Sequence, residues 1–549
     1  MRKQRHLLSR TTALLLAASL IRPAAAYAET GQRLIALVGD ITDDMLVTGL
    51  DVFFLGSYLC LNPNGLRRDL TPEKCDLDEN GTVDAVDLTL LKRQKISGDA
   101  PKAIYETYEI KPIVPPVSAL KPSLPSVGEA RILTFAVSFP DCGFDLESPA
   151  EMVQEYCFGE EDTDSMFYPM ESVPAYYSRA SYGRLRLQGD VFAYTAKNPL
   201  ADYTVNNAEA LTEEILAAFA PELDYQKYDA DGDRILDSVV LMLPEDALKS
   251  DSDGDKKPDW WPFSVPYSGN REFDGITPGT YCVTTVSLDV ADTNCHLAHE
   301  LGHAMGMPDY YKIHKDETFE TQGLPGFAGI ELMDDGSGDL SAFSKLMLGW
   351  IAEGELQVYT GGEQTFILNS MQQMPSCLMI PRNKSDGYLS EFFLVEYLTN
   401  EGNNAACFTD GFRTRYTPRS GVRILHCQAE VKEGAFGPEF RYNDRSSEYD
   451  VSNQKQRVLR IVNDADFLSN EPVTAEQPGF HWYAEDGTLS VDPELTVKKE
   501  TFYCGPAFDW EKWIEQYGSE SQLNHISDPS YLDGSRYVIR VSGGSAALH

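Results

Sequence analysis

The sequence predicts a multidomain protein: a small all-α calcium-binding unit, a mixed α/β (α+β) metal-dependent domain and a β-rich C-terminal region. Three observations support this prediction. Acidic loops with calcium-site spacing lie near the N-terminus. A helix-forming segment with two histidines four residues apart lies mid-chain. Short apolar runs between turn residues fill the later part. The 549 residues suffice for roughly three or four domains.

Residues 1–28 have the organisation of a secretory signal peptide. A basic start (Arg2–Arg5) precedes a short apolar run at residues 12–21, and Ala26-Tyr27-Ala28 fits an A-x-A cleavage site. A membrane anchor is the alternative, but the run is too short to span a bilayer. We therefore expect a secreted, extracellular protein that begins near Glu29.

Charge and cysteines restrict the partners and the covalent structure. A formal net charge of -39 argues against nucleic acid and anionic membranes as partners. The chain has 10 cysteines, and an even number permits full pairing. The nearest candidate pairs are Cys60 with Cys75 and Cys282 with Cys295, and free buried thiols are the alternative.

A complete calcium loop runs from Asp76 to Asp87. Oxygen-bearing side chains stand at the ligand positions, and Gly81 stands at the sharp turn. Position 12 is Asp, where an ordinary EF-hand has Glu. A leucine-containing helix follows. The predicted calcium ligands are Asp76, Asp78, Asn80, Thr82, Asp84 and Asp87.

A weaker copy of this loop lies upstream. Met45 stands where the loop needs Gly, so we expect weaker calcium binding there. Two such units with Asp at position 12 resemble a type I dockerin, here residues 33–98. The resemblance implies docking to a cohesin domain of a cellulosome-type scaffoldin; a calcium-buffering pair is the alternative. The predicted ligands are Asp40, Thr42, Asp44, Thr48 and Asp51.

Residues 99–130 are predicted to be a proline-rich linker. Lys111–Val127 contains repeated prolines and few structured runs, which is typical of a semi-rigid spacer. An apolar run at Arg131–Pro140 predicts the first buried strand of the next domain, residues 131–465.

Two acidic turns within that domain also suggest calcium. Clustered carboxylates on a tight Gly turn repel one another unless a cation joins them. Asp251–Asp255 with Asp259 repeats the spacing of the first turn. Solvated turns are the alternative for both. The ligands predicted at the first turn are Asp229, Asp231, Asp233 and Asp237.

The central motif is His299–Asp309, which reads H-E-x-x-H-x-x-G-x-P-D. Residues four apart share one helix face, so His299 and His303 can hold one Zn²⁺, and Glu300 can take a proton from a water that the metal activates. Gly306 and Pro308 end the helix, and the turn would return Asp309 as a third ligand. A buried amphipathic helix is the alternative. His296 and His314 are weaker candidate ligands.

The segment His299–Tyr311 resembles the zinc motif of the immune inhibitor A family of secreted bacterial metallopeptidases. Gly329–Gly336, Asp339–Lys345 and Leu348–Trp350 resemble the segments that follow it in that family. The resemblance implies a metzincin-like fold with Met333 in a Met-turn beneath the zinc. Metzincins usually have His at the position of Asp309, so this ligand departs from the wider pattern.

After Trp350, apolar runs separated by Gly, Asn and Asp predict strands, and residues 466–549 are expected to form a β-rich C-terminal region. The predicted function is a secreted zinc endopeptidase on a cohesin scaffold. A catalytically silent adhesion or binding module on the same scaffold is the alternative; a glycoside hydrolase lacks a recognisable carboxylate pair. The predicted strands are 365–368, 391–397, 422–425, 458–462 and 537–541.

Overall fold

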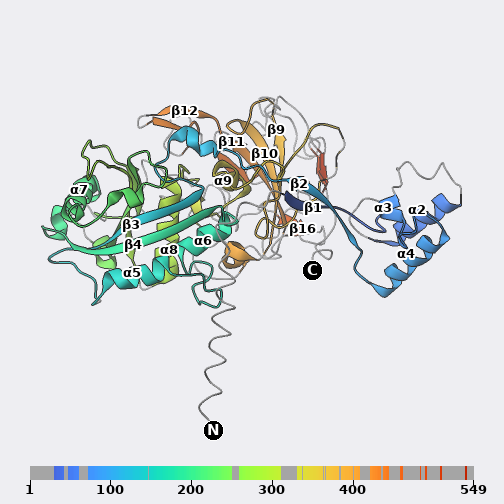
Figure 1. Ribbon diagram of the computed structural model, residues 1–549, viewed down its shortest axis with the longest axis horizontal. Helices are drawn as coiled ribbons and strands as arrows, with labels where there is room; N and C mark the ends of the chain where they lie inside the picture. The colour runs from blue at the N-terminus through green and yellow to red at the C-terminus, as the bar shows by residue number, and fades with distance from the viewer. Residues whose placement is uncertain are drawn as a thin grey trace, which may run out of the picture.

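The computed structural model describes most of the chain between residues 30 and 461 (Figure 1). The predicted signal peptide, Thr42, Asp44, Asp251–Asp255, Tyr311, His314 and most of residues 466–549 lie outside the described residues. The described ranges are 30–41, 47–60, 72–249, 259–310, 331–408, 421–443 and 458–461, without positions 146, 288, 335, 337, 363, 365, 383, 384, 400, 435 and 436, and with short strands beyond.

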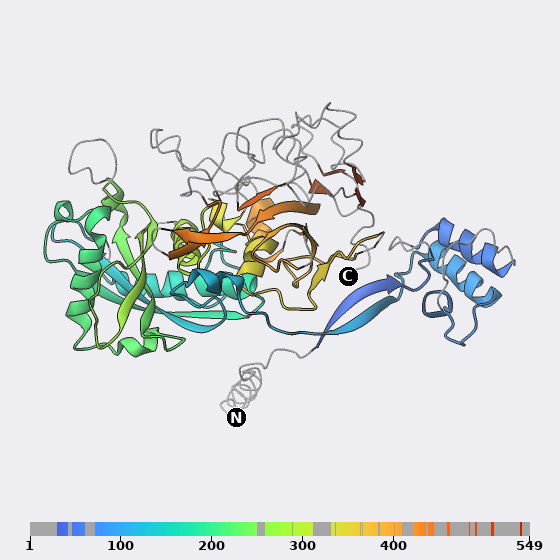
Figure 2. The ribbon, with the colours of Figure 1, turned by 90° about the horizontal axis from the view of Figure 1, so that it is seen from above.

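A small all-α unit forms one end of the molecule (Figures 1 and 2). It contains α2 (Gly49–Leu59), α3 (Pro72–Cys75) and α4 (Ala85–Ser97). Thr48 and Asp84 begin α2 and α4 with capping boxes, because each side chain accepts a hydrogen bond from the first turn. The buried core of the unit is small and comprises Ile41, Leu55, Cys75 and Leu91.

A two-stranded antiparallel ribbon joins this unit to the rest of the protein (Figure 2). It pairs β1 (Thr30–Leu37) with β2 (Ala103–Glu109). The Val38 amide donates to the Lys102 carbonyl at 2.8 Å, so the helical unit brings the two strands together. The structure thus differs from the expected linker at residues 99–130, because ladder hydrogen bonds order its first part as a strand.

The proline-rich segment 111–127 packs on the large domain and is not a free spacer. It contains η1 (Pro116–Leu120) and buries Val117 and Leu124 in the main core. The Leu124 amide donates to the Ala304 carbonyl at 3.1 Å. The Trp350 indole donates to the Ser126 carbonyl at 2.6 Å. We call residues 111–127 the strap.

The strap gives a prediction about truncation. A chain that starts at Lys111 should fold, whereas one that starts at Gly128 should melt at a clearly lower temperature or fail to fold. Burying one Val or Leu side chain contributes about 1.5–3 kcal/mol, and the second truncation loses both buried strap residues. Thermal melts of the two truncations against the full chain test this. Equal melting temperatures would mean that the strap is dispensable.

The large domain is built on a five-stranded sheet of order β4-β3-β5-β7-β6. The pairs β3–β4, β3–β5 and β5–β7 are parallel, and β6 is an antiparallel edge. The predicted strand at 131–140 is β3, shifted slightly toward the N-terminus. The strands are β3 (Gly128–Ser138), β4 (Leu185–Thr195), β5 (Ile235–Pro244), β6 (Phe263–Pro266) and β7 (Thr277–Val286).

Helices cover both faces of this sheet. One face packs on α5 (Pro149–Phe158), α6 (Val173–Ala180) and α8 (Val290–Ala304). The other face packs on α7 (Ala208–Phe219) and η4 (Tyr225–Tyr228). This alternation follows from the strands, whose successive side chains enter opposite cores. Short 3-10 turns complete the layer: η2 (Leu200–Asp202), η3 (Val205–Asn207) and η5 (Glu245–Lys249).

A second five-stranded sheet follows, of order β14-β11-β10-β9-β8. The predicted strands at 391–397, 422–425 and 458–462 correspond to β10, β11 and β14, but the described residues 366–368 form no strand. Helix α9 (Ala342–Met347) shares the main core with this sheet. The strands are β8 (Leu356–Val358), β9 (Cys377–Pro381), β10 (Glu391–Leu398), β11 (Gly421–Gln428) and β14 (Leu459–Ile461).

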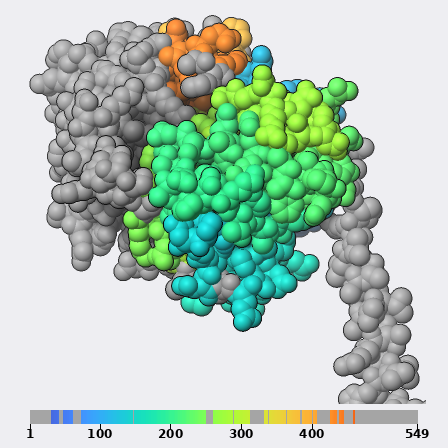
Figure 3. Space-filling model, turned by 90° about the vertical axis from the view of Figure 1, so that its left-hand side faces the viewer, coloured from blue at the N-terminus to red at the C-terminus, as the bar shows by residue number. Residues whose placement is uncertain are grey.

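The remaining described elements are short. The β12–β13 hairpin lies above the large domain, at the upper edge of the face in Figure 3. The predicted strand at 537–541 corresponds to β18. The eight cysteines whose sulfurs are described are free thiols, so neither suggested pair forms a disulfide. The elements are η7 (Leu332–Asp334), η8 (Gly402–Phe408), β12 (Val431–Gly434), β13 (Gly437–Phe440), β15 (Trp482–Tyr483), β16 (Leu489–Ser490), β17 (Ala507–Asp509) and β18 (Val538–Arg540).

Candidate metal centre

Helix α8 positions the two motif histidines. It begins at Asp289, whose side chain accepts from the amides of the first turn. One face of α8, which includes Leu297, Ala298 and Leu301, is buried in the main core. The opposite face carries His299 and His303, whose ring centroids lie 4.8 Å apart. The predicted helix therefore has its apolar residues on one face and its two histidines on the other, as the spacing implies.

A tight turn after α8 returns Asp309 to the histidines. Gly306 has φ +96, which favours glycine, and its amide donates to the His303 carbonyl at 2.8 Å. Asp309 Oδ1 lies 3.0 Å from His299 Nε2 and 3.2 Å from His303 Nε2. Ligands of a tetrahedral zinc, each about 2.0–2.1 Å from the ion, lie roughly 3.3 Å apart. The three groups therefore fit zinc with only small shifts.

Backbone carbonyls fix the orientation of both imidazoles. His299 Nδ1 lies 2.7 Å from the Leu332 carbonyl, and His303 Nδ1 lies 2.8 Å from the Met307 carbonyl. Each Nδ1–H donates to its carbonyl, so each Nε2 is left facing Asp309. The Met307 carbonyl comes from within the motif, whereas the Leu332 carbonyl comes from η7, which the motif alone does not reveal.

The electrostatics of the cluster favour positive charge between its members. Burial opposes the charged form of His299, but Asp309 outweighs it and raises the pKa of His299 to about 9. The same balance raises the pKa of His303. Burial favours neutral Asp309, yet the charge of His303 and the hydrogen bonds of both imidazoles hold its pKa well below its usual range. Protons or a divalent cation can supply this positive charge.

Glu300 and Met333 flank the cluster. Glu300 follows His299 on α8, is only 4% exposed, and its charge contributes to the raised pKa of both histidines. Met333 lies against α8: a Cβ at Gly302 would stand 2.5 Å from the Met333 sulfur. The absence of a side chain at Gly302 therefore leaves room for the Met333 side chain.

Other predicted site residues lie elsewhere. His296 Nδ1 lies 3.8 Å from Asp292 on the same helix, outside the cluster of His299, His303 and Asp309. The buried Tyr177 hydroxyl donates to the Ala298 carbonyl at 2.6 Å and so supports α8.

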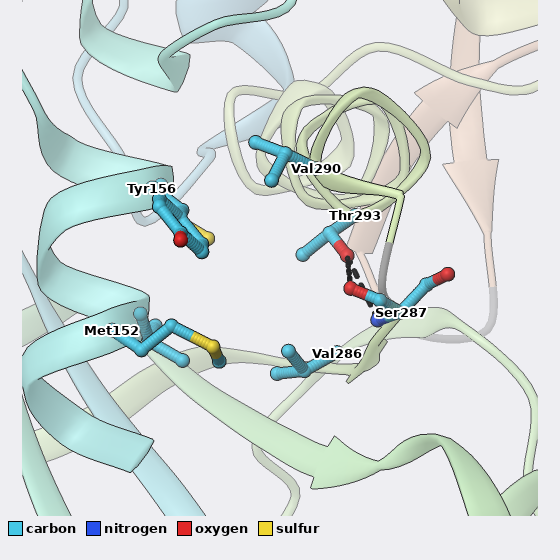
Figure 4. A pocket seen from close by; sticks show the side chains of 8 residues that line it. Met152, Tyr156, Val286, Ser287, Val290 and Thr293 are labelled. Carbon is cyan, nitrogen blue, oxygen red and sulfur yellow. Dashed lines mark hydrogen bonds between the residues drawn. The ribbon is translucent and has the colours of Figure 1, made fainter. Parts of the chain in front are cut away.

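A small apolar pocket lies where β7 enters α8 (Figure 4). Met152 and Tyr156 of α5 face Val286 and Val290 across it, and the Thr293 hydroxyl bonds with the Ser287 backbone at its edge. The pocket contains none of the metal-cluster residues.

The second calcium loop of the helical unit has its carboxylates together. One oxygen each of Asp76, Asp78 and Asp87 lies within 4.8 Å of the others. Gly81 has φ +87 at the sharp turn, and its amide donates to Asp76 at 2.7 Å. Asn80 and Thr82 bond to each other beside them, and Asp84 caps α4. The six predicted ligands therefore line one loop.

The first loop repeats this arrangement at its described residues. Asp51 accepts from the Ile41 amide at 2.8 Å and the Thr48 amide at 2.6 Å. Asp87 accepts equivalently from Leu77 and Asp84 in the second loop. Asp40 is fully buried. The two loops are thus structural copies where both are described.

The acidic turn before β5 forms a third group. Oxygens of Asp229, Asp231 and Asp237 lie within 4.8 Å of one another, and Asp233 lies beside them. Burial, followed by the charges of the neighbouring aspartates, raises the pKa of Asp237 to about 8. The fully buried Asp237 therefore resists ionisation unless a cation joins the group.

Comparisons with known proteins identify one part of the chain. Residues 38–94 match the dockerin type I domain family, so this unit is a dockerin, the module that attaches to a cohesin in cellulosome-type assemblies. No curated protein matches the chain. Within the described residues, no helix is long and apolar enough to cross a membrane.

Solved structures add little. Two crystal forms of OgpA from Akkermansia muciniphila are similar at 13% and 15% identity. Each alignment covers 50% of this chain and 72% of that chain, with a TM-score of 0.23. Scores this low assign neither a fold nor an activity to the large domain.

Proposed function

We propose that this protein is a secreted zinc-dependent endopeptidase that its dockerin attaches to a cohesin scaffold. The observation that supports the activity is the meeting of His299 Nε2, His303 Nε2 and Asp309 Oδ1 beside the buried Glu300. Three protein ligands leave one position of a tetrahedral zinc open, as catalytic sites require. The resemblance of this segment to immune inhibitor A peptidases supports the same proposal.

Each residue of the centre has a separate role in the proposed peptide hydrolysis. Zinc bound here would supply a Lewis acid that lowers the pKa of water and polarises a carbonyl. Glu300 takes a proton from the attacking water and passes it to the leaving amine. The Leu332 and Met307 carbonyls hold the imidazole rings in place, and Asp309 balances the charge.

Proteolysis of denatured casein tests the proposal. The purified full chain should cleave casein, a zinc-selective chelator should stop the cleavage, and added zinc should restore it. A chain that binds zinc but cleaves no substrate would favour the alternative, a silent binding module on the scaffold. A chain that binds no zinc and cleaves no substrate would refute the endopeptidase proposal and leave the silent module standing.

Asp309→Ala should lower zinc affinity and proteolysis together. The variant loses the carboxylate that both imidazoles face, and with it one of the three ligands. Zinc content after dialysis and casein cleavage measure the two effects, with His303→Ala as the reference for a lost ligand. Unchanged zinc content in Asp309→Ala would assign the third ligand to another group.

We also propose a structural calcium ion at Asp229, Asp231, Asp233 and Asp237. The raised pKa of Asp237 means that, without calcium, its contribution to stability declines as pH rises from about 4 to about 8. Asp237→Asn should remove that decline and the stabilisation by calcium. Melting temperatures at pH 5 and pH 8, with calcium or a chelator, measure this. Comparison at equal calcium cancels the dockerin's contribution, and an unchanged calcium response would refute the site.

A further inference from the structure

A buried carboxyl group immediately before η7 has no role in the chemistry proposed above. Glu331 is fully buried, two residues before Met333. Its Oε1 accepts from the Ser344 hydroxyl, and its Oε2 has no hydrogen-bond partner among the described residues. A buried carboxyl group is costly to retain, so its contacts indicate what it does.

The hydrogen bonds of Glu331 lead to the loop that carries the third ligand. The Ser344 hydroxyl, which donates to Glu331, also lies 3.0 Å from the Tyr310 hydroxyl. Tyr310 follows Asp309 in the chain, and its amide donates to the Met333 carbonyl at 2.8 Å. Tyr310 is therefore held at both its backbone and its side chain.

The backbone of Glu331 holds the other side of the centre. Its carbonyl accepts from the Asp334 amide at 3.0 Å and the Gly336 amide at 3.1 Å, which closes the turn of η7. That turn presents the Leu332 carbonyl to His299. One residue thus contacts both segments that orient metal ligands.

Helix α9 connects this arrangement to the second sheet. Ser341 begins α9 and lies 3.4 Å from the Ser344 hydroxyl. The Ala342 amide donates to Glu396 at 2.8 Å, and Glu396 forms a buried ion pair with Arg423. Burial, opposed by the serine hydrogen bonds and by Arg423, raises the pKa of Glu331 to about 7. A neutral side chain of the same shape should therefore replace it well.

We propose that Glu331 is a positioning residue for the metal centre: through Ser344 and Tyr310, its carboxyl group fixes the loop that carries Asp309 against the turn that holds His299. The inference rests on the proposed zinc site. Tyr310, Ser344 and Glu331 form one hydrogen-bonded relay, and removing any member releases the third ligand from the turn.

Zinc affinity, measured by competition with a chromophoric chelator in saturating calcium, tests the relay. Tyr310→Phe and Glu331→Ala should each weaken zinc binding about 10-fold or more, as is typical when a group behind a ligand is lost. Glu331→Gln keeps an acceptor for Ser344 and should bind zinc within about threefold of the unaltered chain.

Tyr225→Phe is the matched control. It removes an equally buried hydroxyl, which donates to the Leu216 carbonyl at 2.6 Å in the other core. It should lose a similar amount of stability and keep zinc affinity. Equal weakening in Tyr225→Phe and Tyr310→Phe would overturn the relay, as would Tyr310→Phe that binds zinc normally.

The remaining outcomes are also decisive. If Glu331→Ala does not fold, Tyr310→Phe and Glu331→Gln still decide: weakened binding in the first with normal binding in the second supports the relay. Zinc affinity lost equally in Glu331→Gln would overturn it. An unaltered chain that takes up no zinc would overturn the proposed function and the relay together, whereas normal zinc binding in every variant would overturn the relay alone.

Discussion

Glu300→Ala should bind zinc and keep the fold but cleave denatured casein about 10²–10⁴-fold more slowly, because the general base is lost and the ligands are kept. The three groups that meet in the structure are His299, His303 and Asp309, and Glu300 stands beside them. Zinc content, a thermal melt and the cleavage rate measure the three parts of this prediction.

Glu300→Gln is the sharper companion variant. It keeps the size of the buried side chain but cannot accept the proton, so its loss of activity should match that of Glu300→Ala. Glu222→Ala, an exposed acid on the same domain, serves as the control with unchanged activity. Cleavage at the original rate by Glu300→Gln would show that the base lies elsewhere.

Calcium removal should abolish binding of the dockerin to cohesin, and Asp76→Ala combined with Asp78→Ala should reduce it by at least about 100-fold. The unit has a core of only a few buried side chains, so metal binding must supply much of its folding free energy. Asp76 also accepts from the Gly81 and Asn80 amides, so its loss removes both a ligand and the closure of the loop.

A pull-down against a panel of cohesins, with calcium and with a chelator, measures this effect beside the casein assay. Glu73→Ala, an exposed acid outside the loop, should bind normally. Proteolysis should largely survive in the Asp76/Asp78 variant. The strap, which packs on the helix that carries the two histidines, lies outside the dockerin calcium loops and keeps its contacts when those loops lose calcium. Calcium-independent cohesin binding would contradict the prediction. Activity that falls with dockerin calcium would show that the ribbon couples the two units.

The sequence by itself determined the local chemistry. The spacing of His299 and His303 places both on one face of a helix, because α-helical geometry repeats every 3.6 residues. The spacing of residues from Asp76 to Asp87 likewise predicted a carboxylate cluster, because the positions of these ligands are set by local loop geometry. The dockerin was recognisable from two such loops, and the family comparison confirms it.

Only the tertiary structure decided how distant segments meet. The pairing of β1 with β2, the burial of the strap, and the carbonyl of Leu332 at His299 join residues 33 or more positions apart. Proline-rich composition predicted a spacer because composition indicates how stiff a segment is. It does not indicate which surface of the protein the segment packs against. Likewise, proximity in sequence suggested cysteine pairs, but the packing of each sulfur keeps Cys282 on Ser264 and Cys295 on the Gly336 carbonyl. Such contacts form where segments far apart in the sequence bury their surfaces against each other, and the whole fold determines which segments those are.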